Sequence, residues 1–349
     1  MSNDFQELPF LAHVGLLITY KCQVSCPHCI IEAGPHRTET MSVDTAIDYI
    51  HQISSYRNGY IKLLSITGGE PFYHLDTLKE ITSFAEQCGM MVSVVTNAYW
   101  ANSKKQAVSI LKMLKSIRML SISTDVYHQQ NIPLERVENA VYAVKTLNIP
   151  YSIAVCTEKE HDTEFIKMMV NLKRIADPEK IRTTITLPFG RALKNPNFSS
   201  YPVSEEPPIS ACIFGNAPVI FPNGRIVACI GPVIKIQSNH PMEFGNLQSN
   251  SLCEIFDKAE LNSILHAVRI WGPRKLISIL QKTSASQYLP KTYLKNSICD
   301  ACYNMISNTD IVKYLDSLRN DQEFNEKVAY ARIYYLGETE MARQLGLGG

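Results

Sequence analysis

The sequence lacks the features that would place it at a membrane or on nucleic acid. None of its apolar runs approaches the roughly 18 residues that a membrane-spanning helix needs. With 34 Lys and Arg against 33 Asp and Glu, the net charge of +1 gives no electrostatic reason to expect a nucleic-acid or membrane partner. The start, 1–9, is short and acidic, unlike a signal peptide. We therefore expect a cytoplasmic protein.

Cysteine, by contrast, is abundant. The cytosol keeps thiols reduced, so ten cysteines in a cytoplasmic chain indicate metal or redox chemistry rather than disulfides. The 45% of hydrophobic residues is typical of a globular protein. A length of 349 residues predicts two domains, or one domain with a long appendage.

Three cysteines stand close together after the first apolar run. Cys22, Cys26 and Cys29 follow the pattern CxxxCxxC. Thiolates at this spacing can hold three irons of a four-iron, four-sulfur (4Fe-4S) cluster and leave the fourth iron open to another ligand. A structural zinc site is the alternative, with His28 or His36 as its fourth ligand. Because His28 lies inside the CxxC step, it is poorly placed to bind the same metal as both neighbours, which favours the cluster.

A second motif, Thr-Gly-Gly-Glu-Pro at 67–71, follows the apolar run 61–66. Two glycines after a strand let another molecule approach bare backbone, and the carboxylate can pair with an ammonium group. Alone, such a sequence is more often a turn. Together, in this order and at these strand ends, the two motifs resemble the radical S-adenosylmethionine (radical SAM) superfamily.

The resemblance implies a cofactor site at several strand ends. The three cysteines would hold the cluster, and the amino and carboxylate groups of S-adenosylmethionine would chelate the open iron. The other matched positions are His28 near the adenine, Gly68, Gly69 and Glu70 at the methionine ammonium, Ser123 and Asp125 at the ribose, and Asn97 and Arg191 close to the cofactor. For Ser123 and Asp125, an ordinary helix N-cap is an equally good interpretation.

The resemblance also implies a reaction. One electron, from a donor such as a flavodoxin or ferredoxin, would cleave S-adenosylmethionine into methionine and a 5′-deoxyadenosyl radical. That radical would take a hydrogen atom from an unactivated carbon of the substrate. The expected enzyme is therefore a radical SAM oxidoreductase.

Strand-like and helix-like segments alternate through the first half of the chain. The predicted strands are 13–19, 61–67, 91–96, 118–123, 151–156 and 181–187, and the predicted helices are 42–56, 75–88, 104–115, 134–147 and 163–175. This alternation predicts an α/β fold, a partial (β/α)6 TIM-type barrel with its chemistry at the C-terminal strand ends. All the motifs named above fall at those ends.

Four further cysteines form two pairs in the second half of the chain. Cys212 and Cys229 flank Pro-Asn-Gly at 222–224, a hairpin signal, and Cys299 and Cys302 open a helical C-terminus. Four cysteines can close a zinc site or hold a second cluster. The first pair resembles the SPASM auxiliary-cluster domain of peptide-modifying radical enzymes, but the seven cysteines of that domain are not present. The resemblance therefore favours the shortened twitch form, with one auxiliary 4Fe-4S cluster on these four cysteines.

These features predict four segments: a radical SAM barrel at 1–192, a linker at 193–210, a twitch-like domain with a basic helical insert at 211–310, and a C-terminal helical segment at 311–349. Within the insert, 261–298 has no Asp or Glu and six basic residues: Arg269, Arg274, Lys275, Lys282, Lys291 and Lys295. A solvated helix face is the more expected interpretation, and a docking surface for an acidic substrate is the alternative.

Three cysteines remain outside both sets. Cys88 and Cys253 are predicted to be core residues. Cys156 ends the fifth strand, where burial as a small hydrophobe is the leading interpretation. The alternative is a thiol in the barrel mouth that donates a hydrogen atom to a substrate radical.

The resemblance favours a ribosomally made peptide as the substrate, with crosslinking, oxidation or epimerisation as the outcome. A radical SAM dehydrogenase or epimerase acting on a sugar, aminocyclitol or other small molecule is one alternative. A non-catalytic iron-sulfur or zinc protein is another. Because the cluster motif begins at Cys22, we expect no separate peptide-recognition domain before it and no cobalamin-binding segment.

Overall fold

Six strands in the first half of the chain form a sheet in sequential order. The computed structural model describes residues 10–194 and 201–346. The strands are β1 (His13–Thr19), β2 (Leu63–Gly68), β3 (Met91–Thr96), β4 (Ile117–Ser123), β5 (Tyr151–Thr157) and β6 (Ile181–Ile185). They are neighbours in this order, and every pair from β2 to β6 is parallel. Such an arrangement needs a crossover connection between successive strands.

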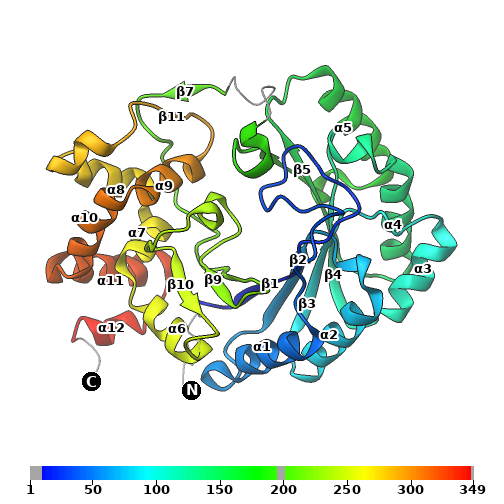
Figure 1. The fold of residues 1–349 in the computed structure, drawn as a ribbon, viewed down its shortest axis with the longest axis horizontal. Coiled ribbons are helices and arrows are strands. Elements are labelled where there is room, and N and C mark those ends of the chain that lie inside the picture. The colour runs from blue at the N-terminus through cyan, green and yellow to red at the C-terminus, as the bar shows by residue number, and fades with distance from the viewer. Residues whose placement is uncertain (1–9, 195–200, 347–349) are drawn as a thin grey trace, which may run out of the picture. The chain divides into compact units, whose positions relative to one another are not determined.

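Helices supply these crossovers: α1 (Val43–Ser55), α2 (Leu75–Gln87), α3 (Lys104–Met113), α4 (Leu134–Thr146) and α5 (Thr163–Ile175). Figure 1 shows them along the outer side of the sheet. In α1 the spacing of Ala46, Ile50 and Ile53 gives one buried stripe, and the Ser42 side chain caps the first turn. The predicted α/β partial barrel is confirmed, with element ends that differ by at most two residues.

The two faces of the sheet differ in character. Alternate residues such as Leu64 and Ile153 are apolar and fully buried, as expected for a face covered by helices. The residues between them are half-buried and often small and polar, for example Ser121 and Ser152, whose hydroxyls lie 3.3 Å apart. Cys156 stands on this second face, because it follows Ser152 at an even spacing along β5. The half-buried face is therefore the one that can receive a ligand.

The chain divides into two units. One consists of Val14–Ser200 and Ile220–Asn223, and the other of Met1–His13, Tyr201–Val219 and Gly224–Gly349. Of the predicted linker at 193–210, residues 195–200 lie outside the described residues, and Val203–Ser204 forms the short strand β7. We keep the boundaries at 192, 210 and 310 as proposals.

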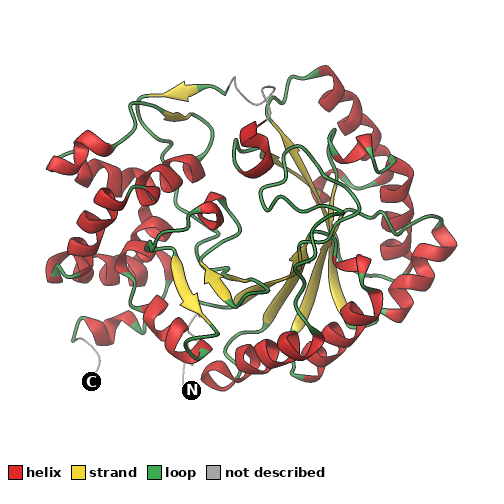
Figure 2. Cartoon of the chain, in the orientation of Figure 1, coloured by secondary structure: helices red, strands yellow, loops and turns green. Residues whose placement is uncertain are grey.

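The second half of the chain is largely helical (Figure 2). Its helices are α6 (Leu252–Glu260), α7 (Ser263–Trp271), α8 (Pro273–Leu280), α9 (Ile298–Ser307), α10 (Thr309–Arg319), α11 (Gln322–Leu336) and α12 (Met341–Gln344). Its strands after β7 are β8 (Val219–Ile220), β9 (Arg225–Val227), β10 (Glu243–Asn246) and β11 (Tyr293–Leu294). The hairpin prediction agrees with β8 and β9, which are sheet neighbours, and with Gly224, whose φ is +80°. None of the described helices has the length and apolar content needed to cross a bilayer.

The apolar residues at 261–280 have helical spacing, and the structure forms two helices there, α7 and α8. The break is at Gly272, whose φ is +75°. A Cβ at this position would lie 1.8 Å from the Ser210 carbonyl oxygen, so the crossing of two backbones requires glycine here. Pro273 then begins α8.

Candidate functional site

The three cysteines of the first motif lie in the irregular segment after β1. Cys22 and Cys26 are buried and Cys29 is half-buried. Cys26 and Cys29 both act electrostatically on Cys22, so the three thiols are neighbours. Burial raises the pKa of Cys22 to about 12, so iron binding has to displace its proton. Three neighbouring thiols fit the protein ligands of a cluster with one open iron.

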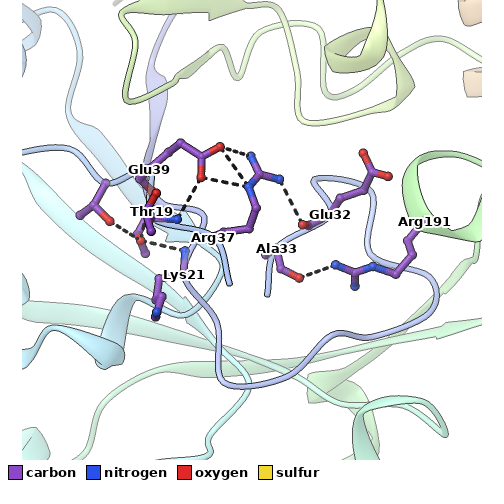
Figure 3. Close-up of polar contacts among 9 residues, drawn as sticks. Thr19, Lys21, Glu32, Ala33, Arg37, Glu39 and Arg191 are labelled. Atoms are coloured by element: carbon purple, nitrogen blue, oxygen red, sulfur yellow. Dashed lines mark hydrogen bonds and ion pairs between the residues drawn. The ribbon is translucent and has the colours of Figure 1, made fainter. Parts of the chain in front are cut away.

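Figure 3 shows polar contacts that hold this cysteine loop. Arg37 donates to both oxygens of Glu39 and, at 3.2 Å, to the carbonyl of Glu32. The backbone N–H of Lys21 donates to the hydroxyl of Thr19 at 3.0 Å. These hydrogen bonds therefore fix the backbone where the loop leaves β1, at Lys21, and where it returns, at Arg37 and Glu39.

The two glycines of the second motif bring the end of β2 against the cysteine loop. Gly69 N donates to Thr19 O at 2.6 Å, and Glu70 N donates to Lys21 O at 2.9 Å. A Cβ at Gly69 would lie 2.2 Å from Lys21 O, and one at Gly68 would lie 2.5 Å from Thr19 O. The sequence predicted room for another molecule here. The glycines admit the chain's own backbone, and the approach of another molecule to them stays a prediction.

Glu70 is fully buried and ties the end of β2 to the end of β3. Its carboxylate accepts hydrogen bonds from Thr96 Oγ1 at 2.8 Å, Asn97 N at 2.8 Å and Phe72 N at 3.1 Å. Burial raises its pKa to about 7. Three donors occupy three of the roughly four acceptor positions of a carboxylate, which leaves one for the expected ammonium group. That role stays a prediction.

Asn97 links β3 to the first cysteine. Its Nδ2 donates to Cys22 Sγ at 3.6 Å, and its Oδ1 accepts from Gln23 Nε2 at 2.9 Å. Asn97 is almost fully buried. The structure thus brings it to the cysteine loop, as expected from its place after the third strand.

Asp125 lies just past β4, two residues after Ser123, and is 1% exposed. Its Oδ1 accepts the backbone N–H groups of Tyr127 and His128, each at 2.9 Å, which is the contact of a cap. Its Oδ2 lies 3.3 Å from His28 Nε2 and 2.8 Å from His128 Nδ1. Burial alone would raise the pKa of Asp125, but the two histidines hold it well below its usual range. Asp125 therefore both caps a turn and orients two imidazoles.

His128 is a site residue that the sequence analysis missed. Against the lowering effect of burial, Asp125 and Cys26 hold the pKa of His128 well above its ordinary value. Its ring lies 5.2 Å from that of His28. The ligand atoms of His28, Asp125 and His128 lie within 4.8 Å of one another, a spacing that could also hold a metal ion. Asp-x-x-His after a strand was the available signal.

The His28 side chain also supports the presence of a ligand at this site. Its ring lies 5.0 Å from the ring of Tyr127. Its Nδ1 is buried and has no hydrogen-bond partner among the described residues. A buried polar atom without a partner is costly, and a bound cofactor can supply one.

Cys156 lies on the half-buried face of β5, where its Sγ is 3.4 Å from Thr184 Oγ1. Burial raises its pKa, and Asp125 and His128 both act on it electrostatically, so the structure places it beside the same site. Cys88 is half-buried at the end of α2. The core prediction for Cys253 is wrong, because this residue is exposed on the solvent side of α6.

Arg191, expected near the cofactor, has its guanidinium on the cysteine loop. It donates to the carbonyls of Cys26 and Ala33, each at 2.6 Å. Figure 3 shows the contact with Ala33.

The second cysteine set also converges. Burial raises the pKa of Cys302, and Cys212, Cys229 and Cys299 raise it further. These four thiols are therefore neighbours. Burial raises the pKa of Cys229 to about 12 and that of Cys299 to about 11. Cys299 and Cys302 lie three residues apart on α9, which places them on one helix face.

The six basic residues of 261–298 have different environments. Arg269 is buried in an ion pair with Glu338 at 2.5 Å, and Arg274 pairs with Glu206. The charges of these two arginines are therefore paired with carboxylates of the same chain. Four lysines of the stretch are exposed: Lys275, Lys282, Lys291 and Lys295. The docking interpretation stays a prediction for these four.

Residues 16–171 match the family model of the Radical SAM superfamily. That range holds the first three cysteines, the GGE motif and the end of β4. This region belongs to the radical SAM superfamily. The chain therefore carries a radical SAM region, the kind of region that uses a 4Fe-4S cluster and S-adenosylmethionine.

Two curated proteins of Bacillus subtilis (strain 168) are similar to the chain. YydG, a protein named for peptide biosynthesis, is 22% identical over 310 residues, which cover 86% of this chain and 94% of YydG. The antilisterial bacteriocin subtilosin biosynthesis protein AlbA is 29% identical over 124 residues, which cover 36% of this chain and 26% of AlbA. A solved structure described as native anSMEcpe with bound AdoMet has a TM-score of 0.52 at 14% identity, over 93% of this chain and 99% of that one. It supports the fold.

Proposed function

We propose that this radical SAM enzyme is an oxidoreductase that modifies a ribosomally made peptide. The supporting observation is that the similarity to YydG covers 86% of the chain, far more than the superfamily region 16–171. We further propose that Cys212, Cys229, Cys299 and Cys302 hold an auxiliary 4Fe-4S cluster, because their thiols are neighbours and four cysteines complete its ligand set. A flavodoxin or ferredoxin would supply electrons.

Each residue of the first site would have a separate role in binding the cofactor. Cys22, Cys26 and Cys29 would bind the cluster, which with S-adenosylmethionine supplies a 5′-deoxyadenosyl radical. Asn97 would donate to the Cys22 sulfur, as it does in this structure. Asp125 would fix the imidazole of His28, whose free Nδ1 is available to the cofactor.

Cys156 would supply a hydrogen atom to the substrate radical, which makes epimerisation the outcome we favour. The raised pKa keeps the thiol protonated, and a thiolate has no hydrogen atom to give. In this step the S–H bond breaks, a C–H bond forms on the opposite face of the substrate carbon, and a thiyl radical remains on Cys156. One electron from the flavodoxin or ferredoxin and one proton from water would restore the thiol.

The test is the reaction of the reconstituted full chain, in deuterated water, with short peptides encoded beside its gene. Epimerisation predicts uptake of one deuterium at one residue, whereas a crosslink or oxidation predicts loss of a hydrogen pair. Cys156→Ala should still cleave S-adenosylmethionine but give no deuterated product, and the exposed Cys253→Ala should behave as the wild type. Product without deuterium would overturn the role of Cys156. Turnover of a sugar or aminocyclitol, with no change in any peptide, would overturn the peptide proposal.

A further inference from the structure

A dipeptide distant in sequence lies directly against the cysteine loop. Gly190 and Arg191 begin the 3-10 turn Gly190–Lys194, which follows β6. Gly190 has a φ of +60°, and a Cβ there would lie 2.4 Å from the carbonyl oxygen of Ile30 and 2.7 Å from that of Cys29. Only glycine permits this approach, because it has neither the strain of a positive φ nor a side chain in the way.

Arg191 then holds the loop at three carbonyl groups. Its backbone N–H donates to Cys29 O at 3.1 Å. Its guanidinium donates through Nη1 to Cys26 O and through Nη2 to Ala33 O, each at 2.6 Å. The last contact is visible in Figure 3. These carbonyls span the segment that carries two of the three cysteine ligands.

Two backbone hydrogen bonds within this segment are longer. Cys29 N donates to Cys26 O at 3.2 Å, and Glu32 N donates to Cys29 O at 3.2 Å. Glu32 has a φ of +56°, a conformation that a residue with a side chain rarely adopts. Short, charge-assisted bonds from Arg191 are therefore the stronger constraint on this part of the loop.

The guanidinium is held by main-chain oxygens alone. Within the described residues, 10–194 and 201–346, no carboxylate forms an ion pair with Arg191. Two planar donors at a fixed separation match two carbonyls seven residues apart, a geometry that the single ammonium of lysine cannot reproduce.

We propose that Arg191 is a positioning residue that sets the Cys26–Ala33 loop in its cluster-binding conformation. It acts through a forked pair of hydrogen bonds rather than through contact with S-adenosylmethionine. Gly190 allows the close approach that this geometry needs. The role does not depend on the identity of the substrate.

The test compares Arg191→Lys, which keeps the charge, with Arg191→Gln, which removes it. In the full chain before reconstitution, hydrogen exchange at the amides of Cys29 and Glu32 should be at least about fivefold faster in both variants, since each loses the fork. After reconstitution, a chelator should remove iron from the first cluster several times faster in both variants than in the wild type. That cluster is identified by the change in its EPR spectrum when S-adenosylmethionine is added. The dissociation constant for S-adenosylmethionine, measured on the intact holoenzyme fraction, should change less than about twofold.

Two control variants make the result specific. Arg182→Gln removes a positive charge from an exposed residue of β6, and Arg225→Lys alters an arginine in the other half of the chain. Both should leave exchange at Cys29 and Glu32 unchanged, and the amides of α4 should exchange as in the wild type in every variant. If Arg191→Lys matches the wild type, charge and not the fork is what matters, and the proposal fails. It also fails if cofactor affinity falls while loop exchange and iron loss stay normal.

Discussion

Each half of the chain has an arginine that donates to two backbone carbonyls, but the charges of these two arginines are balanced differently. In the second half of the chain, Arg225 donates to Ile234 O at 3.0 Å and to Ile236 O at 2.7 Å, and it pairs with Glu243 at 2.7 Å. Among the described residues, the partners of the Arg191 guanidinium are all backbone carbonyls. A carboxylate offsets the charge of Arg225, whereas the charge of Arg191 acts on the Cys29 thiol and lowers its pKa against the larger raising effect of burial.

The sites also differ in how the chain assembles them. Cys22, Cys26 and Cys29 come from one loop, so a few contacts to that loop can bring them together. The second set comes from segments between 212 and 302, so its thiols meet only when that unit has folded. Closing a long loop costs more conformational entropy than closing a short one. We therefore expect the first site to be sensitive to local contacts and the second to the stability of its unit.

The largest expected effect comes from removing one ligand at each site. Cys26→Ala should lower reductive cleavage of S-adenosylmethionine by about a thousandfold or more, because the open iron is lost. Cys302→Ala should keep that cleavage but lose peptide modification. The measurements are 5′-deoxyadenosine and modified peptide by mass spectrometry, with iron content as a check. Equal loss of cleavage in the two variants would mean that the sites do not have separate roles.

An intermediate effect is expected at Asp125, which both caps a turn and orients two histidines. Asp125→Asn keeps a capping oxygen but removes the negative charge between the imidazoles, so the dissociation constant for S-adenosylmethionine should rise about tenfold. Asp162 offers a matched control, because its Oδ1 accepts from Glu164 N and Phe165 N as the cap of α5. Asp162→Asn should leave that constant unchanged. Similar affinities in all three proteins, by calorimetry, would limit Asp125 to the capping role.

The smallest expected effect is a pH dependence in the unit of the second site. Burial and then Arg225 lower the pKa of His240 to about 4. The pKa of this histidine in the unfolded chain is about 6.5, so below that pH the unfolded chain binds a proton that the folded chain does not. The free energy of unfolding therefore decreases as the pH is lowered, by about 1 kcal/mol from pH 7.5 to pH 5.5. His240→Asn should remove this part of the slope while keeping an acceptor for Met242 N. Denaturant unfolding of both proteins at the two pH values measures it, and an unchanged slope would contradict the assignment.

Much of the fold was predictable because its signals are local. Helical spacing in α1 and alternation in β5 follow from burial of one face, so their ends were placed within two residues. The Gly272-Pro273 pair is a local signal for the break after α7, whereas the crossing with the distant Ser210 backbone was not predictable. Cys253 was predicted as core from an apolar neighbourhood, but the helix turns it toward solvent.

At the site, the cysteines could be identified from spacing, whereas their supporting contacts could not. His128 has only the weak signal of Asp-x-x-His after a strand, and its role becomes recognisable through its contacts with Asp125 and Cys26. Arg191 was placed near the cofactor by resemblance, and only coordinates reveal its partners on the loop. Such contacts join residues far apart in sequence, which no local pattern records.

The glycine pair at the end of β2 affects how any genetic test of this enzyme is interpreted. A methyl group at Gly69 would collide with the main chain at Lys21, next to the first ligand. An alanine there would push Cys22 out of place before a cofactor ever arrived. Loss of activity in such a mutant would therefore report a displaced metal ligand, and it would say nothing about whether Gly69 touches the cofactor.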